Sequence, residues 1–280
     1  MTLRLGWFTT ARGPGSRAMF EAVVAARASG LLSGVEFAVV FCNRDRGEDE
    51  VTDEFLDRVE SLKIPLVTMS SVAYRRRVGG ERSRSGEPLP AWRRDYDHDV
   101  DRALEGFPFD LGVLAGYMLI FEREFSRSHP LLNLHPALPE GPIGTWREVI
   151  RSLIRTGAAE SGVMLHLAIP EVDAGPVAAY CRYPIHGPAF DAAWDALGDN
   201  TLQDDGAIEA SPLFAAIRAA GVARESPLLV ATLQAFADGR LVVRDGQVFD
   251  SAGQPAAAAD LTAEVEAIVA SSADAPGIPR

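Results

Sequence analysis

The chain has 280 residues, of which 47% are hydrophobic and 24% charged, and its net charge is −12 at pH 7. This length and composition suffice for one sizeable soluble core. The negative charge repels nucleic-acid phosphates and anionic membranes, so we expect neither as a partner. The start of the chain lacks a positively charged stretch before a long apolar run, and no apolar run approaches the roughly 20 residues that span a bilayer. We therefore expect a cytoplasmic protein.

Strand-like and helix-like segments alternate along the chain. Strands are predicted at 3–8, 35–42, 64–69, 110–116 and 131–134, and helices at 17–30, 51–62 and 92–105. A helix over about Trp146 to Thr156 then precedes strands near 162–169 and 176–183 and a helical region at about 213–238. This alternation predicts an α/β fold with a doubly wound, mostly parallel, Rossmann-like sheet.

Two segments have the composition of insertions. Residues 78–91 are rich in glycine, proline and charge, and residues 186–212 are rich in Gly, Asp and Asn. Each is expected to be either a mobile lid or a surface loop, and the composition favours the surface loop.

Cysteine and histidine usage argues against a disulfide framework and against a metal site. Cys42 and Cys181 each lie in an apolar, strand-like run, which is typical of inert core thiols. His98, His129 and His186 stand on separate polar or turn segments without paired ligand spacing. We expect no metal cofactor.

Asn133, His135 and Asp173 form the polar triplet with the most potential for chemistry. In LLNLHPALP, Asn133 and His135 are two residues apart at a strand end, so their side chains point to the same side, and Pro136 then opens a loop. In PEVDAGP, Asp173 follows the end of another apolar strand. Parallel α/β sheets have their ligand crevice outside the carboxyl ends of strands, where both loops are expected to meet.

Such a triplet suits acyl transfer to an amine, because the tetrahedral intermediate needs an oxyanion partner and a proton shuttle. Asn133 and protonated His135 can donate to the oxyanion, while Asp173 can keep the histidine cationic or relay the proton of the amine. Taken one by one, the same residues also fit a turn cap, a satisfied buried histidine and an ordinary turn aspartate.

The pairing of NLHPALP with EVDAGP resembles the Asn-x-His and Asp-Ala-Gly-Pro signatures of the folate-dependent formyltransferases. Further similar segments are ARGPGSR near the start, VLAGYM before the LLNL strand and QAFADGRLVV near the end. The resemblance implies that Asn133, His135 and Asp173 are catalytic and move a formyl group from 10-formyltetrahydrofolate to a primary amine.

The resemblance covers about residues 1–245, which we expect to be the catalytic domain. Residues 246–280 would then form a C-terminal extension with one short alanine-rich helix, frayed after Ala270.

The resemblance also implies two binding regions. The pterin of the folate would lie near His166 and against a wall made of Met118, Leu119, Ile120 and Phe121. A substrate phosphate would bind between the first strand and the first helix, at Gly13, Gly15, Ser16 and Arg17. On the residues alone, the first region is more typical of an apolar core segment than of a cofactor pocket. The second is equally a tight turn, since the full dinucleotide fingerprint is absent.

Three departures from the family pattern concern the acceptor. Arg17 stands where the relatives usually have Asn, and Trp146 stands where other side chains are usual. In AAGVARESPLLV the expected Glu falls closest to Val222, with Arg224 and Glu225 as its substitutes after a small shift.

The leading expectation for the acceptor is glycinamide ribonucleotide, as in de novo purine synthesis, with the protein acting as a monomer or a homodimer on a small phosphorylated amine. The alternatives are another amine, such as an amino sugar or an amino acid derivative, and water, as in formyltetrahydrofolate hydrolases. A noncatalytic ligand-binding protein on the same fold is a further class.

Overall fold

The structure is a computed structural model, and it describes residues 2–83, 87–171, 173–198 and 201–273. An eight-stranded sheet runs through these residues in the order β10-β7-β6-β5-β4-β1-β2-β3. Its strands are β1 (Leu3–Thr9), β2 (Val35–Cys42), β3 (Leu66–Thr68), β4 (Leu111–Ala115), β5 (Leu131–His135), β6 (Glu160–Leu167), β7 (Val177–Pro184) and β10 (Ala259–Asp260). A separate hairpin joins β8 (Leu241–Arg244) to β9 (Gln247–Asp250).

The sheet is mostly parallel, as predicted. The strands β3, β2, β1, β4 and β5 run parallel to one another, and β7 runs parallel to β10. Only the pairings of β6 with β5 and with β7 are antiparallel in the sheet of the described residues. This reversal of one strand is important for the position of the polar triplet.

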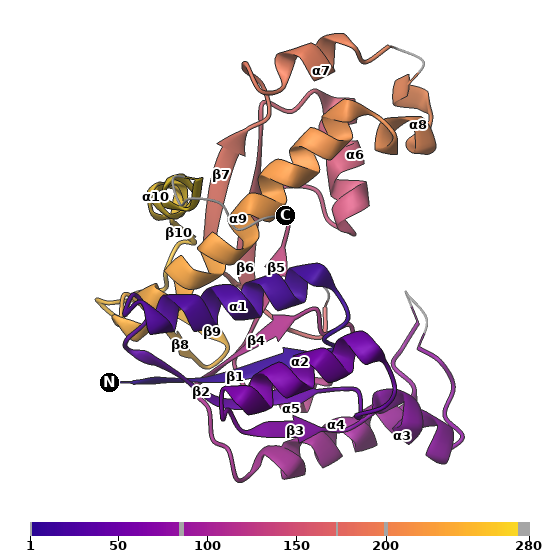
Figure 1. Ribbon diagram of the computed structural model, residues 1–280, viewed down its shortest axis with the longest axis vertical. Helices are drawn as coiled ribbons and strands as arrows, with labels where there is room; N and C mark the ends of the chain where they lie inside the picture. Colours follow the sequence, from indigo (N-terminus) through magenta and orange to yellow (C-terminus); the bar gives the residue numbers. More distant parts are fainter. Residues whose placement is uncertain (1, 84–86, 172, 199–200, 274–280) are drawn as a thin grey trace.

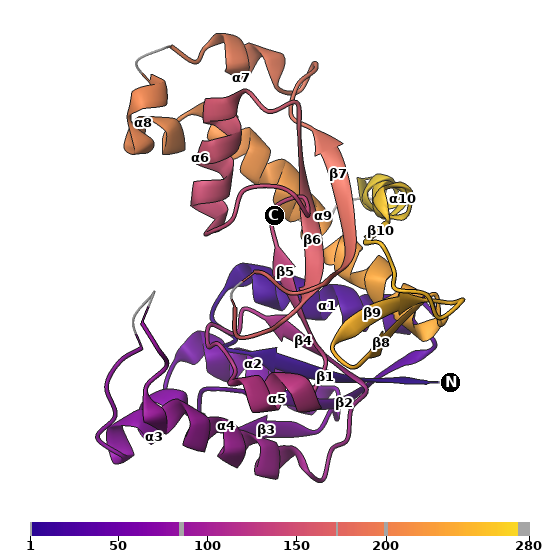
Figure 2. The same cartoon turned by 180° about the vertical axis from the view of Figure 1, so that it is seen from behind.

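Helices cover both faces of the sheet (Figures 1 and 2). They are α1 (Pro14–Ala28), α2 (Glu50–Ser61), α3 (Ser71–Arg77), α4 (Ala91–Leu104), α5 (Arg123–Ser128), α6 (Trp146–Thr156), α7 (Asp191–Asp195), α8 (Asp205–Glu209), α9 (Pro212–Ala237) and α10 (Thr262–Ala273), with a 3₁₀ turn at Thr201–Gln203. None of the described helices is long and apolar enough to cross a bilayer.

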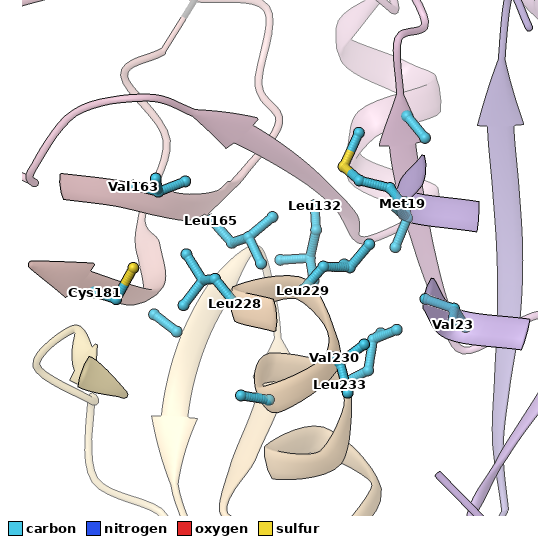
Figure 3. Close-up of a cluster of buried hydrophobic side chains, with 14 of the residues drawn as sticks. Met19, Val23, Leu132, Val163, Leu165, Cys181, Leu228, Leu229, Val230 and Leu233 are labelled. Atoms are coloured by element: carbon cyan, nitrogen blue, oxygen red, sulfur yellow. The ribbon is translucent and has the colours of Figure 1, made fainter. Parts of the chain in front are cut away.

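Successive residues of β1 show how the sheet separates two cores. Trp7 is fully buried with α1, α2 and α9 on one face, and its neighbour Phe8 is fully buried with α3, α4 and α5 on the other. This is the two-residue period of a strand that is covered on both sides. Leu228 and Leu229 of α9 pack among side chains of α1, β5, β6 and β7 (Figure 3). The predicted doubly wound arrangement is therefore confirmed.

Helix α6 coincides with its predicted range because both of its ends carry strong local signals. Thr145 and Glu148 form a reciprocal capping box at the N-terminus. Gly157 ends the helix in the left-handed conformation, with φ of 59°. Such end signals are local, so they can be read without knowing the tertiary structure.

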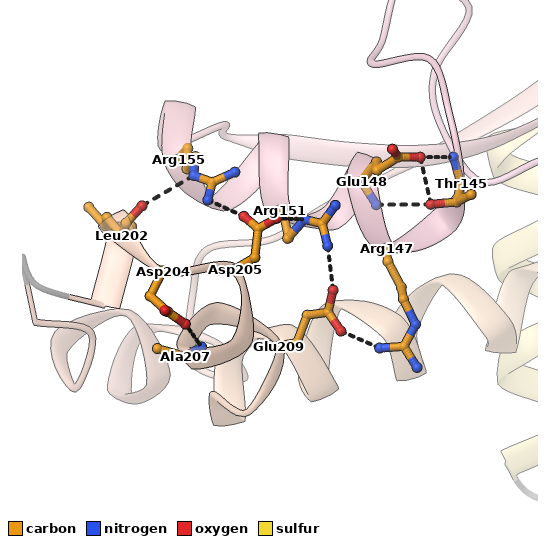
Figure 4. Close-up of polar contacts among 10 residues, drawn as sticks. All are labelled: Thr145, Arg147, Glu148, Arg151, Arg155, Leu202, Asp204, Asp205, Ala207 and Glu209. Atoms are coloured by element: carbon orange, nitrogen blue, oxygen red, sulfur yellow. Dashed lines mark hydrogen bonds and ion pairs between the residues drawn. The ribbon is translucent and has the colours of Figure 1, made fainter. Parts of the chain in front are cut away.

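The expectation of a surface loop at residues 186–212 is wrong for the part that the structure describes. This segment forms α7, the 3₁₀ turn and α8, and it packs apolar side chains, including Trp194 and fully buried Ile208, against the main core. Arginines of α6 pair with Asp205 and Glu209 of α8 (Figure 4). Several of the Gly and Asp residues that suggested a loop lie inside these helices, such as Asp191 in α7 and Asp205 and Gly206 in α8.

Two other expectations fall partly outside the described residues. Of the expected insertion at 78–91, residues 84–86 are not described, and the others have no regular structure after the end of α3 until α4 begins at Ala91. The expected fraying after Ala270 concerns mainly residues 274–280, which are also outside the description.

The chain beyond residue 245 continues the same folded body. The β8–β9 hairpin spans position 245, β10 extends the main sheet beside β7, and α10 buries Val265 in the main core. An independent C-terminal unit is not seen among the described residues.

Candidate active site

The antiparallel pairing of β5 with β6 builds the centre of the site. Asn133 of β5 lies directly opposite His166 of β6, so both side chains project from the same face of the sheet. His135 projects from this face too, because it is two residues further along β5. Asp173 was expected here because the carboxyl ends of parallel strands meet at one edge of the sheet. That reason is wrong, because β6 runs antiparallel to β5. On either side of residue 172, the chain instead returns to β5 and β6: Leu167 N–H donates to the Pro176 carbonyl, and Asp173 contacts His135 and His166.

The polar triplet and His166 form one cluster around the carboxylate of Asp173. Asp173 Oδ2 lies 3.4 Å from His135 Nδ1, and its Oδ1 lies 3.4 Å from His166 Nε2. Asn133 Nδ2 donates to Asp173 Oδ1 at 3.4 Å and lies 3.3 Å from His166 Nε2. The structure thus brings together four residues that the sequence separates by up to forty positions.

His135 is held from both sides of its ring. Its Nδ1 faces Asp173, its Nε2 lies 3.1 Å from the carbonyl oxygen of Pro142, and the residue is 3% exposed. Both ring nitrogens therefore face acceptors, and only the doubly protonated imidazolium donates to both. His135 therefore lies between the Asp173 carboxylate and the Pro142 carbonyl.

Asp173 is kept ionised by its neighbours. The hydrogen bond with His166 lowers the pKa of Asp173, burial opposes this effect, and the charges of His135 and His166 lower the pKa further. The carboxylate is thus the stable form at neutral pH.

The backbone around Asp173 has an unusual conformation. Asp173 itself has φ of +55°, a left-handed conformation that aspartate tolerates better than most residues. Two residues later, Gly175 passes so close to β6 that an added Cβ would lie 1.8 Å from the carbonyl oxygen of Leu167. Glycine is therefore required for the loop to fold back over the strands.

A cavity of about 240 Å³ opens beside this cluster, and we call it the site cavity. Its lining contains Leu114, Tyr117, Met118, Leu119, Ile120, Phe121, Ser126, Asn133, His166, Ala168, Ile169 and Asp173. The five residues expected to bind the pterin are all in this lining, together with Asn133 and Asp173. His135 is not, because it lies behind Asp173. A larger open hollow of about 720 Å³ between α3 and α4 contains none of the predicted site residues.

The loop expected to bind phosphate lies at the N-terminus of α1, next to the end of β4. Gly13 is the N-cap residue and provides no side-chain cap, while Ser16 Oγ donates to the Gly13 carbonyl at 2.8 Å. A Cβ on Gly116 would lie 2.9 Å from Ser16 Cβ, so the loop packs tightly against the chain that leads into the wall of the site cavity. Arg17 pairs with Glu54 at 3.1 Å.

A second group of polar residues approaches this loop from α9. Glu225 is 8% exposed and accepts from Arg218 Nη1 at 2.7 Å, and its Oε2 would lie 3.9 Å from a Cβ on Gly15. The Arg218 guanidinium also lies 4.7 Å from the centre of the Trp146 ring. Of the two substitutes expected from the sequence, Glu225 therefore lies beside the loop.

Arg224 is directed elsewhere, since its guanidinium pairs with Glu266 at 2.6 Å and lies over the Tyr183 ring. Sequence inspection missed Arg218 as a neighbour of this site. No signal in the spacing indicates it, because α9 and the α1 loop are about two hundred positions apart.

Residues 13–191 match the formyl transferase family, and this match covers more than half of the chain. The chain therefore belongs to the formyl transferase family.

Two phosphoribosylglycinamide formyltransferases are among the similar curated proteins. The one from Dictyostelium discoideum is 33% identical over 109 residues, which cover 35% of this chain and 53% of that protein. The one from Escherichia coli (strain K12) is 32% identical over 97 residues, covering 33% of this chain and 44% of that protein. The chain thus spans about half the length of these two relatives.

Solved structures show the same fold. A phosphoribosylglycinamide formyltransferase from Coxiella burnetii superposes with a TM-score of 0.62 at 22% identity and covers 93% of this chain and 100% of that chain. A formyltetrahydrofolate deformylase from Pseudomonas syringae pv. tomato str. DC3000 has a TM-score of 0.57 at 16% identity and covers 89% of this chain and 66% of that chain.

The close approach of Gly175 to β6 gives a first prediction. Gly175→Ala should lower the free energy of unfolding by about 1–3 kcal/mol, because the backbone of Leu167 has to move away from the new methyl group. Urea unfolding measures this effect. Gly198→Ala is the control, since no atom lies within 4 Å of its added Cβ. Equal unfolding midpoints for the two variants would contradict this account of the loop.

The lowered pKa of Asp173 gives a second prediction. A carboxyl group whose pKa is lower in the folded state stabilises that state above its unfolded pKa of about 3.9, and this contribution is lost as pH falls through the folded pKa. Asp173→Asn should therefore reduce the free energy of unfolding at about pH 6, and the difference should shrink below about pH 4. Urea titrations at several pH values measure it. A difference that grew toward acid pH would refute the assignment.

Proposed function

We propose that the protein transfers a formyl group from 10-formyltetrahydrofolate to a primary amine, and that glycinamide ribonucleotide is the acceptor. One observation carries the proposal: an ionised aspartate, an asparagine and a histidine border a cavity whose other wall is apolar. Membership in the formyl transferase family supports it, and so does the similarity to two phosphoribosylglycinamide formyltransferases.

The site cavity suits the donor. Its apolar wall of Met118 to Phe121 offers a surface for a flat heteroaromatic ring, and Met118 is 82% exposed at the entrance. Asn133, His166 and Asp173 also line the cavity, and there the formyl group would reach the polar cluster. Apolar walls with a few converging polar groups are typical of small-molecule sites.

The chemistry follows from these positions. The amine attacks the formyl carbon, a C–N bond forms, and the carbonyl oxygen becomes an oxyanion that Asn133 Nδ2 stabilises by donation. Asp173 accepts the proton that the amine loses, directly or through a water molecule. The intermediate then collapses and the bond to the folate nitrogen breaks. The proton that Asp173 took from the amine passes to that nitrogen, which completes tetrahydrofolate and restores the Asp173 carboxylate.

His135 has a supporting role in this arrangement. Its Nδ1 lies against Asp173 Oδ2 and would hold this carboxylate in place. Donation from His135 to the oxyanion would first require Nε2 to leave the Pro142 carbonyl. His166 contacts the other oxygen of Asp173 and borders the cavity directly. The Asp173 carboxylate is thus oriented through both of its oxygens.

The acceptor would bind on the side of the α1 loop. The N-terminus of α1 at Gly13, Gly15 and Ser16 offers backbone N–H groups to a phosphate, and Arg17 can add a charge-assisted bond if it releases Glu54. Glu225 lies beside Gly15 and presents a carboxylate that suits an ammonium or hydroxyl group. These groups fit a phosphorylated amine.

The first functional test follows the absorbance change on deformylation of a 10-formyltetrahydrofolate analogue. It is run with glycinamide ribonucleotide, with other primary amines, and without an acceptor. Product formed only with the ribonucleotide supports the full proposal. Product formed only with another amine refutes this acceptor but keeps the transferase activity, and release without any acceptor indicates a hydrolase.

The proton-transfer role of Asp173 can be tested separately. Asp173→Asn should lower the turnover number by roughly two orders of magnitude or more while leaving the affinity for the folate unchanged. Steady-state kinetics and binding of an unreactive folate measure the two quantities. Glu171→Gln is the matched control, because this residue lies in the same loop with its side chain 55% exposed. Unchanged turnover in the Asp173 variant would exclude the role.

The phosphate role of Arg17 gives a kinetic prediction. Arg17→Ala should raise the KM for the acceptor about tenfold with little change in the turnover number, as loss of uniform binding does. Arg58→Ala is the control, since this arginine pairs with Glu21 on the surface. A loss of turnover with an unchanged KM would contradict phosphate binding at this position.

A further inference from the structure

Helix α4 carries two charged side chains on its buried face. Arg93 and Asp97, one turn apart, are each 1% exposed, and Arg93 Nη2 lies 3.5 Å from Asp97 Oδ1. Burying two ions costs several kcal/mol for each, and a mutual contact at this distance recovers only part of that. Buried charges of this kind need further partners, and the partners indicate their role.

Both side chains bind the backbone of the same neighbouring segment. Arg93 Nη2 donates to the carbonyl oxygen of Ile120 at 2.7 Å, and Asp97 Oδ2 accepts from the backbone N–H of Glu122 at 2.8 Å. Residues 117–122, between β4 and α5, form neither helix nor strand. At these two points the segment therefore depends on α4 for its hydrogen bonds.

The same segment forms the apolar wall of the site cavity. Residues 117–121 all line it, and Phe121 is stacked between Tyr117 at 4.8 Å and Phe125 at 4.1 Å between ring centres. The shape of the wall is thus set by the aromatic stack and by the two bonds from α4. Of these, only the bonds fix the backbone directly.

We propose that Arg93 and Asp97 are positioning residues for the donor: they hold the backbone at Ile120 and Glu122 so that the wall is shaped for the pterin before it binds. This inference rests on the proposed function, since it takes the site cavity to be the folate site. The two residues touch neither substrate and act through the wall segment.

The charge state of the pair fits this role. Burial raises the pKa of Asp97 to about 6, while the charge of Arg93 and the N–H of Glu122 oppose the rise. The carboxylate is therefore ionised at neutral pH, the form that accepts most strongly from both donors.

The test removes both charges together. In Arg93→Met/Asp97→Leu, two apolar side chains replace the pair, an exchange that often preserves or raises the stability of a fold. The dissociation constant of an unreactive folate analogue, measured by calorimetry, should rise about tenfold if the wall keeps its binding shape for roughly a tenth of the time. The turnover number at saturating donor and the KM for the acceptor should stay unchanged.

Two further variants separate positioning from a merely structural role. Asp97→Asn keeps an oxygen acceptor for the Glu122 N–H, so the affinity for the analogue should stay close to the native value. Arg94→Gln/Asp95→Asn removes an exposed pair from the same helix and should have no effect. A lower melting temperature with a smaller active fraction, but an unchanged dissociation constant, would overturn the inference.

Binding of the analogue to the native protein is the control for the proposed function itself. If it binds the analogue and the double variant binds it equally well, the positioning role is wrong while the folate site stands. If the native protein does not bind the analogue, the proposed donor fails, and the positioning role fails with it.

Discussion

The antiparallel pairing of β6 with β5 is the constraint on which the rest of the site depends. It places His166 opposite Asn133 and turns the following loop back over the sheet, so that Asp173 lies among three polar side chains. If β6 ran parallel to β5, the end of β6 and the loop after it would lie at the opposite end of β5. Gly175 allows the chain to return to β6, because only a residue without a side chain can pass so close to the Leu167 carbonyl.

The polar cluster built by this pairing has one side that borders the site cavity and one side that does not. On one face, the site cavity presents Asn133, His166 and Asp173 to an apolar wall that α4 holds in place. Behind it, His135 is closed off between Asp173 and Pro142. In the proposed reaction, Asn133, His166 and Asp173 would meet the donor in the site cavity, while His135, which contacts Asp173, is 3% exposed.

The proposed acceptor side is assembled from parts that are distant in the chain. Glu225 of α9 lies beside Gly15, Arg218 of α9 donates to Glu225, and the Arg218 guanidinium lies over the ring of Trp146 at the start of α6. Arg17 and Trp146 in this region also differ from the pattern that the resemblance led us to expect.

Much of the fold was accessible from the sequence because its signals are local. The alternation of strands and helices, the capping box of α6, and the N-x-H spacing that turns two side chains to one face all depend on residues within one or two turns of each other. The apolar wall and the glycine loop were indicated by resemblance. The helices within 186–212 were missed, because their apolar residues become meaningful only against α6 and α9.

The sequence by itself therefore determined the fold class and singled out the polar triplet, and its resemblance to a family indicated the candidate donor wall. Only the tertiary structure decided the direction of β6, the position of His135 behind Asp173, the bonds from Arg93 and Asp97 to the wall, and the approach of Glu225 to Gly15. The physical reason is range: periodicity and turn chemistry act between near neighbours, whereas these contacts arise from strand order and from the packing of segments far apart in the chain.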